Sequence, residues 1–115
     1  PGINANPYYS RLATIHTGSV VYVSGLYGDP SATGEEQIRQ IYKQFEEILP
    51  EAGTDFNHLA KGQYYVTDWD ILGALGTVRG EYYKPNRPPT SSLIPVRGIG
   101  RPDAKITIDL VGVTL

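Results

Sequence analysis

The chain has 115 residues and a mass of 12.6 kDa, and 40% of its residues are hydrophobic while 19% are charged. This is the balance of one globular domain with a core of its own, so we interpret residues 1–115 as a single domain. The chain has no cysteine, which excludes disulfides and cysteine-based metal sites, and it has only two histidines. We therefore expect neither a metal nor a cofactor.

The net charge and the hydropathy pattern argue against two classes of binding partner, nucleic acids and membranes. A formal net charge of -2 at pH 7 gives no basic footprint, which argues against binding to nucleic acid through its phosphates. The apolar runs last only a few residues, against the roughly 20 that a helix needs to cross a bilayer. These features favour a soluble, cytoplasmic protein with no membrane partner.

The N-terminal half predicts a hairpin followed by an amphipathic helix. Two β-branched runs, residues 13–16 and 20–23, are separated by Thr17-Gly18-Ser19, which is typical of a hairpin. Thr33 and Glu36 have the spacing of a capping box, and apolar residues then recur at helical spacing to about Leu49. Pro50 and Gly53 are expected to stop this helix.

The C-terminal half predicts a strand, a helix and two more strands. The first strand covers about residues 58–67, and Asp68 or Asp70 can cap a helix that turns its apolar residues inward: Ile71, Leu72, Leu75, Val78 and Tyr82. Gly76 and Gly80 are unusual inside this helix, because each costs about 1 kcal/mol against alanine. Strands follow over 91–96 and 105–113. The order β-β-α-β-α-β-β predicts an α+β fold with both helices on one sheet face.

Several short segments along the chain form a recognisable set: Pro7-Tyr8, Tyr22-Val23-Ser24-Gly25, Glu51-Ala52-Gly53, Tyr65-Val66-Thr67-Asp68, Glu81-Tyr82-Tyr83, Asn86-Arg87-Pro88 and Lys105-Ile106-Thr107-Ile108-Asp109. Together they resemble the RidA/YjgF/UK114 family, whose members are also described as endoribonuclease L-PSP-like. The resemblance implies a chorismate-mutase-like fold, a homotrimer and small-molecule clefts between subunits. It also implies hydrolytic deamination of reactive imines and enamines derived from amino acids, such as 2-aminoacrylate.

The sequence departs from the family pattern at the polar positions of that cleft. Thr90 stands where the family has the arginine that binds the substrate carboxylate, and Thr107 aligns with a glutamate of the last strand. An acidic residue is retained two positions later as Asp109, and Gly76 replaces an asparagine of the second helix. A threonine offers one hydrogen bond where arginine offers a charged fork, so the resemblance implies an altered substrate or a lost activity.

Two residues have competing interpretations. Arg79 replaces a family tyrosine one turn from Gly76, so its guanidinium could rebuild the carboxylate site; the alternative is that it extends to solvent or bonds Glu81 or Asp70. Asp109 lies on an apolar alternating strand, where it could act as a general acid or base. Its alternative role is an ion pair across a subunit interface.

We therefore interpret the protein as an imine or enamine deaminase-type hydrolase, or a close relative with an altered substrate. The alternative is a non-catalytic trimer that binds or senses a small molecule, and a ribonuclease is disfavoured by the sequence pI of about 5.6. The predicted catalytic residues are Asp109 and Tyr8, and the predicted ligand-binding residues are Ser24, Gly25, Arg79, Thr90, Ser91 and Thr107.

Overall fold

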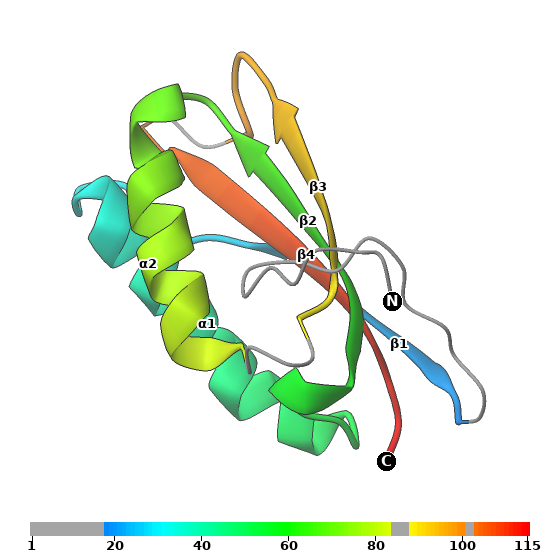
Figure 1. Cartoon of the computed structure of the whole chain (residues 1–115). Coiled ribbons are helices and arrows are strands. Elements are labelled where there is room, and N and C mark those ends of the chain that lie inside the picture. The colour runs from blue at the N-terminus through cyan, green and yellow to red at the C-terminus, as the bar shows by residue number, and fades with distance from the viewer. Residues whose placement is uncertain (1–17, 84–87, 101–102) are drawn as a thin grey trace.

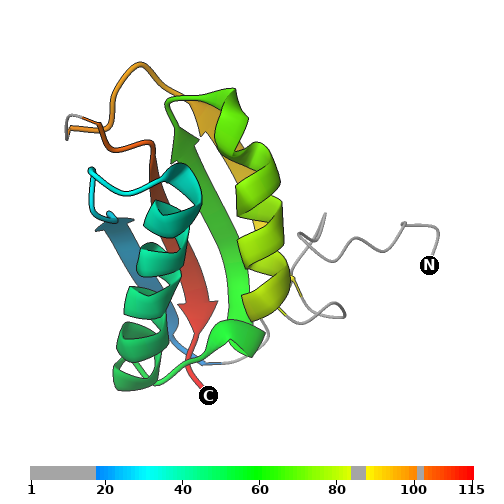
Figure 2. The same cartoon turned by 90° about the vertical axis from the view of Figure 1, so that its left-hand side faces the viewer.

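The computed structural model describes residues 18–83, 88–100 and 103–115. In this part of the chain two helices cover one face of a four-stranded sheet, as Figures 1 and 2 show. The main elements are β1 (Val20–Leu26), α1 (Gly34–Glu51), β2 (Leu59–Val66), α2 (Leu72–Tyr82), β3 (Thr90–Pro95) and β4 (Ile106–Val113). Their order and the α+β class confirm the sequence prediction. The predicted first strand, at residues 13–16, lies outside the described residues.

The sheet has the strand order β1-β4-β2-β3. The strand β4 is antiparallel to both of its neighbours, whereas β2 and β3 are parallel. A parallel pair needs a crossover, and α2 provides it by passing over the sheet between β2 and β3 (Figure 1). None of the helices in the described ranges is long and apolar enough to span a membrane.

The helix α1 begins at the predicted cap and ends slightly later than predicted. The Thr33 hydroxyl accepts a hydrogen bond from the Glu36 amide at 3.2 Å, which confirms the cap. Pro50 does not stop the helix as predicted, because a proline in the last turn removes only its own N–H bond and the helix continues to Glu51. The chain then turns at Gly53, whose φ is +82°, and the Thr54 amide closes the end on the Leu49 carbonyl.

The core lies between the two helices and the covered sheet face. Both helices contribute apolar stripes, and the strands contribute alternate residues; the fully buried members include Ile38, Ile41, Phe45, Leu75, Val78, Ile106, Ile108 and Leu110. The second helix differs from the prediction at both ends. Asp68 caps a short 3₁₀ turn, Trp69–Ile71, so α2 begins only at Leu72. At the other end Tyr83 is buried and Tyr82 is half-buried.

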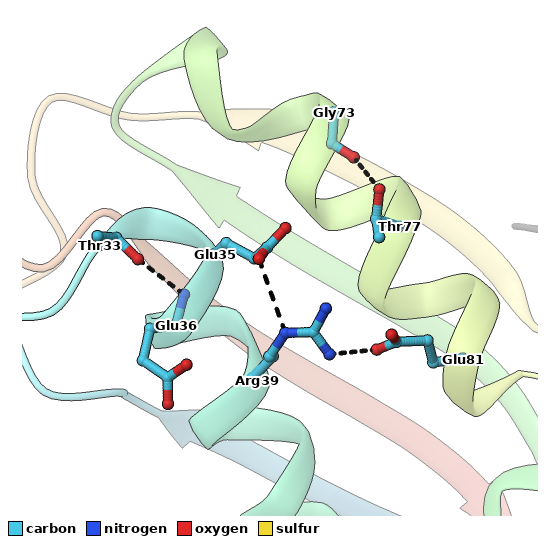
Figure 3. A network of polar contacts seen from close by, with 7 residues as sticks. All are labelled: Thr33, Glu35, Glu36, Arg39, Gly73, Thr77 and Glu81. Atoms are coloured by element: carbon cyan, nitrogen blue, oxygen red, sulfur yellow. Dashed lines mark hydrogen bonds and ion pairs between the residues drawn. The ribbon is translucent and has the colours of Figure 1, made fainter.

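A polar contact joins the two helices on their outer side. Figure 3 shows the Arg39 guanidinium of α1 between Glu81 of α2, to which it donates a hydrogen bond, and Glu35, which lies 3.8 Å away on its own helix. The hydrogen bond to Glu81 raises the pKa of Arg39. Glu81 thereby ties α2 to α1.

Candidate functional site

The strand register decides which predicted residues can meet. The Tyr64 side chain of β2 is fully buried under the helices, so its neighbours Gln63 and Tyr65 face the opposite side of the sheet. Register pairs Gln63 with Asp109 of β4, and Lys61 with Thr90 of β3. We call this opposite side the open face, because both described α-helices lie on the other side of the sheet (Figure 1).

Two predicted residues line one groove on the open face. This open-face groove has a volume of about 370 Å³, and the side chains at its surface are Tyr22, Ser24, Lys61, Gln63, Asp109 and Val111. It combines the Asp109 carboxylate with the Lys61 amine and the Ser24 hydroxyl. A negative group, a positive group and a neutral donor within a volume of small-molecule size can orient a polar ligand by its charges.

Ser24 and Gly25 come from an irregular part of β1. The pairing of β1 with β4 is regular from Val20 to Val23 and shifts before Leu26, so these two residues occupy the irregularity. A bulge redirects the side chains of the bulged strand. It leaves Ser24 exposed at the groove.

The two threonines at family cleft positions use their hydroxyls within the fold. Thr90 donates to the Ala60 carbonyl at 2.7 Å, and Thr107 donates to the Leu26 carbonyl at 2.8 Å. Thr107 is also only 8% exposed. A hydroxyl has a single proton to donate, so in this arrangement neither threonine donates to a ligand.

Arg79 and Ser91 lie on the other side of the sheet. Ser91 pairs with Gly62, two residues before Tyr64, and therefore faces the helices. Together with Arg79 of α2 it lines a second groove of about 420 Å³, which we call the helix-side groove; its other residues are Leu72, Leu75 and Leu93. Arg79 is half-buried, with its guanidinium carbon 5.0 Å from the centre of the Tyr64 ring. Within one chain, Arg79 and Asp109 therefore line separate grooves.

Tyr8 lies outside the described residues. In the described ranges no three histidine, aspartate or glutamate side chains gather as a metal site would require. His58 pairs with Asp55 at 2.7 Å at the end of a 3₁₀ turn.

Sequence reasoning missed Lys61, the cation of the open-face groove. The segment was recognised as a strand, and its alternation already places Lys61, Gln63 and Tyr65 on one face. Alternation does not show which residues of the neighbouring strands lie beside Lys61. Only the register shows that Lys61 lies beside Thr90 on the neighbouring strand, and the groove joins it to Asp109 on the strand at its other side.

Comparison with curated proteins gives two relatives at low identity. Protein DfrA of Myxococcus xanthus is 24% identical over 113 residues, which cover 92% of this chain and 85% of that protein. The 2-iminobutanoate/2-iminopropanoate deaminase of Mus musculus is 27% identical over 89 residues, which cover 71% of this chain and 64% of the mouse protein.

Solved structures of the same architecture are similar over most of their length. A YjgF-family protein from Neisseria meningitidis has a TM-score of 0.78 at 22% identity, with 85% of this chain and 81% of that chain covered. A member of the YjgF/YER057c/UK114 family from Mycobacterium tuberculosis has a TM-score of 0.75 at 23% identity, with 86% and 82% covered. The sequence model of the endoribonuclease L-PSP family matches residues 2–114. The chain therefore belongs to this family, that of the YjgF or Rid proteins, and has its chorismate-mutase-like α+β fold.

Proposed function

We propose that the protein hydrolyses small imines, or the enamines that tautomerise to them, in the open-face groove. The observation that carries the proposal is that Asp109, Lys61 and Ser24 line this one groove. The name of the mouse relative, an iminobutanoate and iminopropanoate deaminase, supports this class of substrate. The substrate is a 2-imino acid: its carboxylate pairs with the Lys61 ammonium, and its C=N carbon faces Asp109.

The Asp109 carboxylate performs the proton transfers of the reaction. It takes a proton from water while the water oxygen bonds to the imine carbon, and it returns that proton to the nitrogen. As the C=O bond of the product forms, the hydroxyl proton of the resulting carbinolamine passes through Asp109 to nitrogen, the C–N bond breaks, and nitrogen leaves as ammonia. The Ser24 hydroxyl donates a hydrogen bond to the nitrogen or oxygen on that carbon. No metal or redox step is needed, because water supplies every atom that the product gains.

The direct test measures ammonia and 2-oxo acid from 2-aminoacrylate that a serine dehydratase generates in the assay. The rate with the protein should exceed the spontaneous rate of hydrolysis. If the rates are equal for 2-aminoacrylate and for a panel of larger 2-imino acids, the protein is not a deaminase of this class. The non-catalytic alternative then predicts that the product 2-oxo acid still binds to the open-face groove.

Lys61→Met separates substrate binding from chemistry. Because it removes the ammonium and keeps the length of the side chain, we expect KM for 2-imino acids to rise about tenfold or more, while kcat changes less. Lys61→Arg should restore most of the affinity. Lys43→Met, on the exposed face of α1, is the matched control and should leave both constants unchanged. Equal KM values for Lys61→Met and the natural protein would contradict this role.

The open face also carries apolar groups that a second chain could cover. Tyr22 is 76% exposed and Val20 is 45% exposed, and both lie on the open face of β1 beside the groove. We propose that three chains associate through this face and close each groove between neighbours. Light scattering after gel filtration should give three times the chain mass of 12.6 kDa. Tyr22→Glu should shift that mass toward the monomer, whereas a natural protein that elutes as a monomer would contradict the assembly.

A further inference from the structure

Another cavity lies at the end of the sheet where β2 and β3 finish and β4 begins (Figure 1). Its volume of about 500 Å³ falls within the range of small-molecule sites in proteins. We call it the end cavity, and three loops line it: Pro30 lies in the loop after β1, Arg97 in the loop after β3 and Lys105 in the loop before β4. It shares no lining residue with the open-face groove, so an inference about it is independent of the proposed reaction.

The loops around the end cavity are bonded to one another. The fully buried Gln37 side chain of α1 donates to a carbonyl of the loop after β1 at 3.1 Å and to the Asp103 carbonyl at 3.3 Å. It also accepts a hydrogen bond from the Lys105 amide at 2.9 Å. The Tyr27 hydroxyl donates to the Ile99 carbonyl, which joins the loop after β3 to the end of β1. The cavity is therefore formed without a ligand, and binding does not have to order its walls.

Two cationic side chains from different loops line the end cavity. Arg97 is exposed and Lys105 is half-buried. Within the described ranges, no carboxylate oxygen lies within 4 Å of a side-chain nitrogen of either residue. The hydrogen bonds with Asp70 and, more weakly, the charge of Lys105 lower the pKa of Asp68, which does not line the cavity. Two cations that share one cavity without an ion pair favour a ligand with more than one negative charge.

The end cavity also offers hydrogen-bond acceptors. The Asp103 carboxylate lines it, from a residue whose φ of +63° is uncommon outside glycine. An ionised carboxylate only accepts hydrogen bonds, so it suits a hydroxyl group and repels a second anion. The Thr67 hydroxyl also lines the cavity and donates a long bond of 3.4 Å to the Lys105 carbonyl, which leaves its oxygen able to accept from a ligand.

We propose that the end cavity binds the phosphate monoester of a small polyhydroxylated molecule, such as a sugar phosphate. The phosphate accepts hydrogen bonds from the Arg97 guanidinium and the Lys105 ammonium, and the ligand hydroxyls donate to the Asp103 carboxylate and the Thr67 oxygen. A phosphate monoester carries nearly two negative charges on one group at pH 7, which matches the two cations. A monocarboxylate would leave one of these cations unpaired, and inorganic phosphate would leave the acceptors unused.

The test measures binding of glucose 6-phosphate, glucose and inorganic phosphate by calorimetry, and it locates the site by amide chemical shifts of the labelled protein. Glucose 6-phosphate should bind at least about tenfold more tightly than glucose, which lacks the dianion, and more tightly than inorganic phosphate, which lacks the hydroxyls. The shifted resonances should cluster at residues 96–98 and 103–105. Equal binding of glucose 6-phosphate and glucose, or binding of neither, overturns the proposal without any variant.

Variants of the two cations separate the end cavity from the open-face groove. Arg97→Gln and Lys105→Met should each weaken binding of glucose 6-phosphate about tenfold or more. Arg97→Lys keeps the charge and should retain part of the affinity. Lys43→Met makes the same change as Lys105→Met on the exposed face of α1 and should bind as the natural protein does. If Lys61→Met weakens binding while the two cavity variants do not, the phosphate occupies the open-face groove and the proposal is wrong.

Asp103→Asn tests whether the end cavity recognises the hydroxyls. Asparagine tolerates the left-handed backbone at this position about as well as aspartate does, so the loop should keep its shape. Loss of the negative charge should tighten binding of inorganic phosphate, whereas glucose 6-phosphate loses its charged acceptor. The ratio of the two affinities should therefore fall. An unchanged ratio would show that Asp103 does not bind the hydroxyls and would overturn the assignment of a polyhydroxylated ligand.

Discussion

Asp109→Asn is expected to lower kcat/KM for 2-aminoacrylate and related 2-imino acids at least about a hundredfold. A positioned acid or base contributes roughly 10²–10⁴ to such a reaction, and the amide of asparagine can neither take the proton from water nor return it to nitrogen. The size and shape of the side chain are nearly kept, so the half-buried position in β4 tolerates the change. Initial rates of ammonia release, corrected for spontaneous hydrolysis, measure the effect.

Two variants make the Asp109 result specific. Asp109→Glu keeps a carboxylate and should retain more activity than Asp109→Asn, although its longer side chain displaces the oxygens. Glu47→Gln makes the same chemical change on the exposed side of α1 and should leave the rate unchanged. Full activity in Asp109→Asn would show that this carboxylate does not transfer the proton, and the open-face groove would then have to be a binding site only.

The helices and strands could be predicted from short sequence patterns, because interactions between residues close in the sequence largely determine where they form. The Thr33 cap and the stripe of apolar residues in α1 are set by neighbours within one or two turns, and both are confirmed. The paired tyrosines of β2 likewise separate as alternation requires, with Tyr64 buried and Tyr65 on the open face. Helix ends were less predictable, because tertiary bonds such as that of Thr54 to the Leu49 carbonyl decide where a helix stops.

The candidate site could not be assembled from periodicity, because it depends on pairing between distant strands. Asp109 and Ser24 were both predicted and do line one groove, but their separation in the sequence gives no register. Arg79 was also predicted as a ligand-binding residue, and within one chain it lines the helix-side groove rather than the open-face groove. A register is fixed by the packing of whole strands, and a shift of one residue would move every side chain to the other face.

The backbone at Gly28, in the loop after β1, lies directly against the backbone of α1. This buried glycine follows β1, and a Cβ built on it would lie 2.6 Å from both the Cα and the carbonyl oxygen of Gln37 in α1. Backbone atoms cannot rotate away as a side chain can. Gln37 is itself fully buried and accepts a hydrogen bond from the Lys105 amide at 2.9 Å, so it connects α1 to the segment before β4.

Gly28→Ala is therefore expected to lower the free energy of unfolding by about 3 kcal/mol or more. The added methyl group forces α1 away from the loop, which strains the packing and breaks the Gln37 bonds. Gly73→Ala is the matched control: its Cβ would meet no atom within 4 Å, and alanine in a helix should stabilise the protein by about 1 kcal/mol. Urea unfolding at one fixed chain concentration measures both. If Gly28→Ala leaves the midpoint unchanged or raises it, the contact between Gly28 and Gln37 does not constrain the fold.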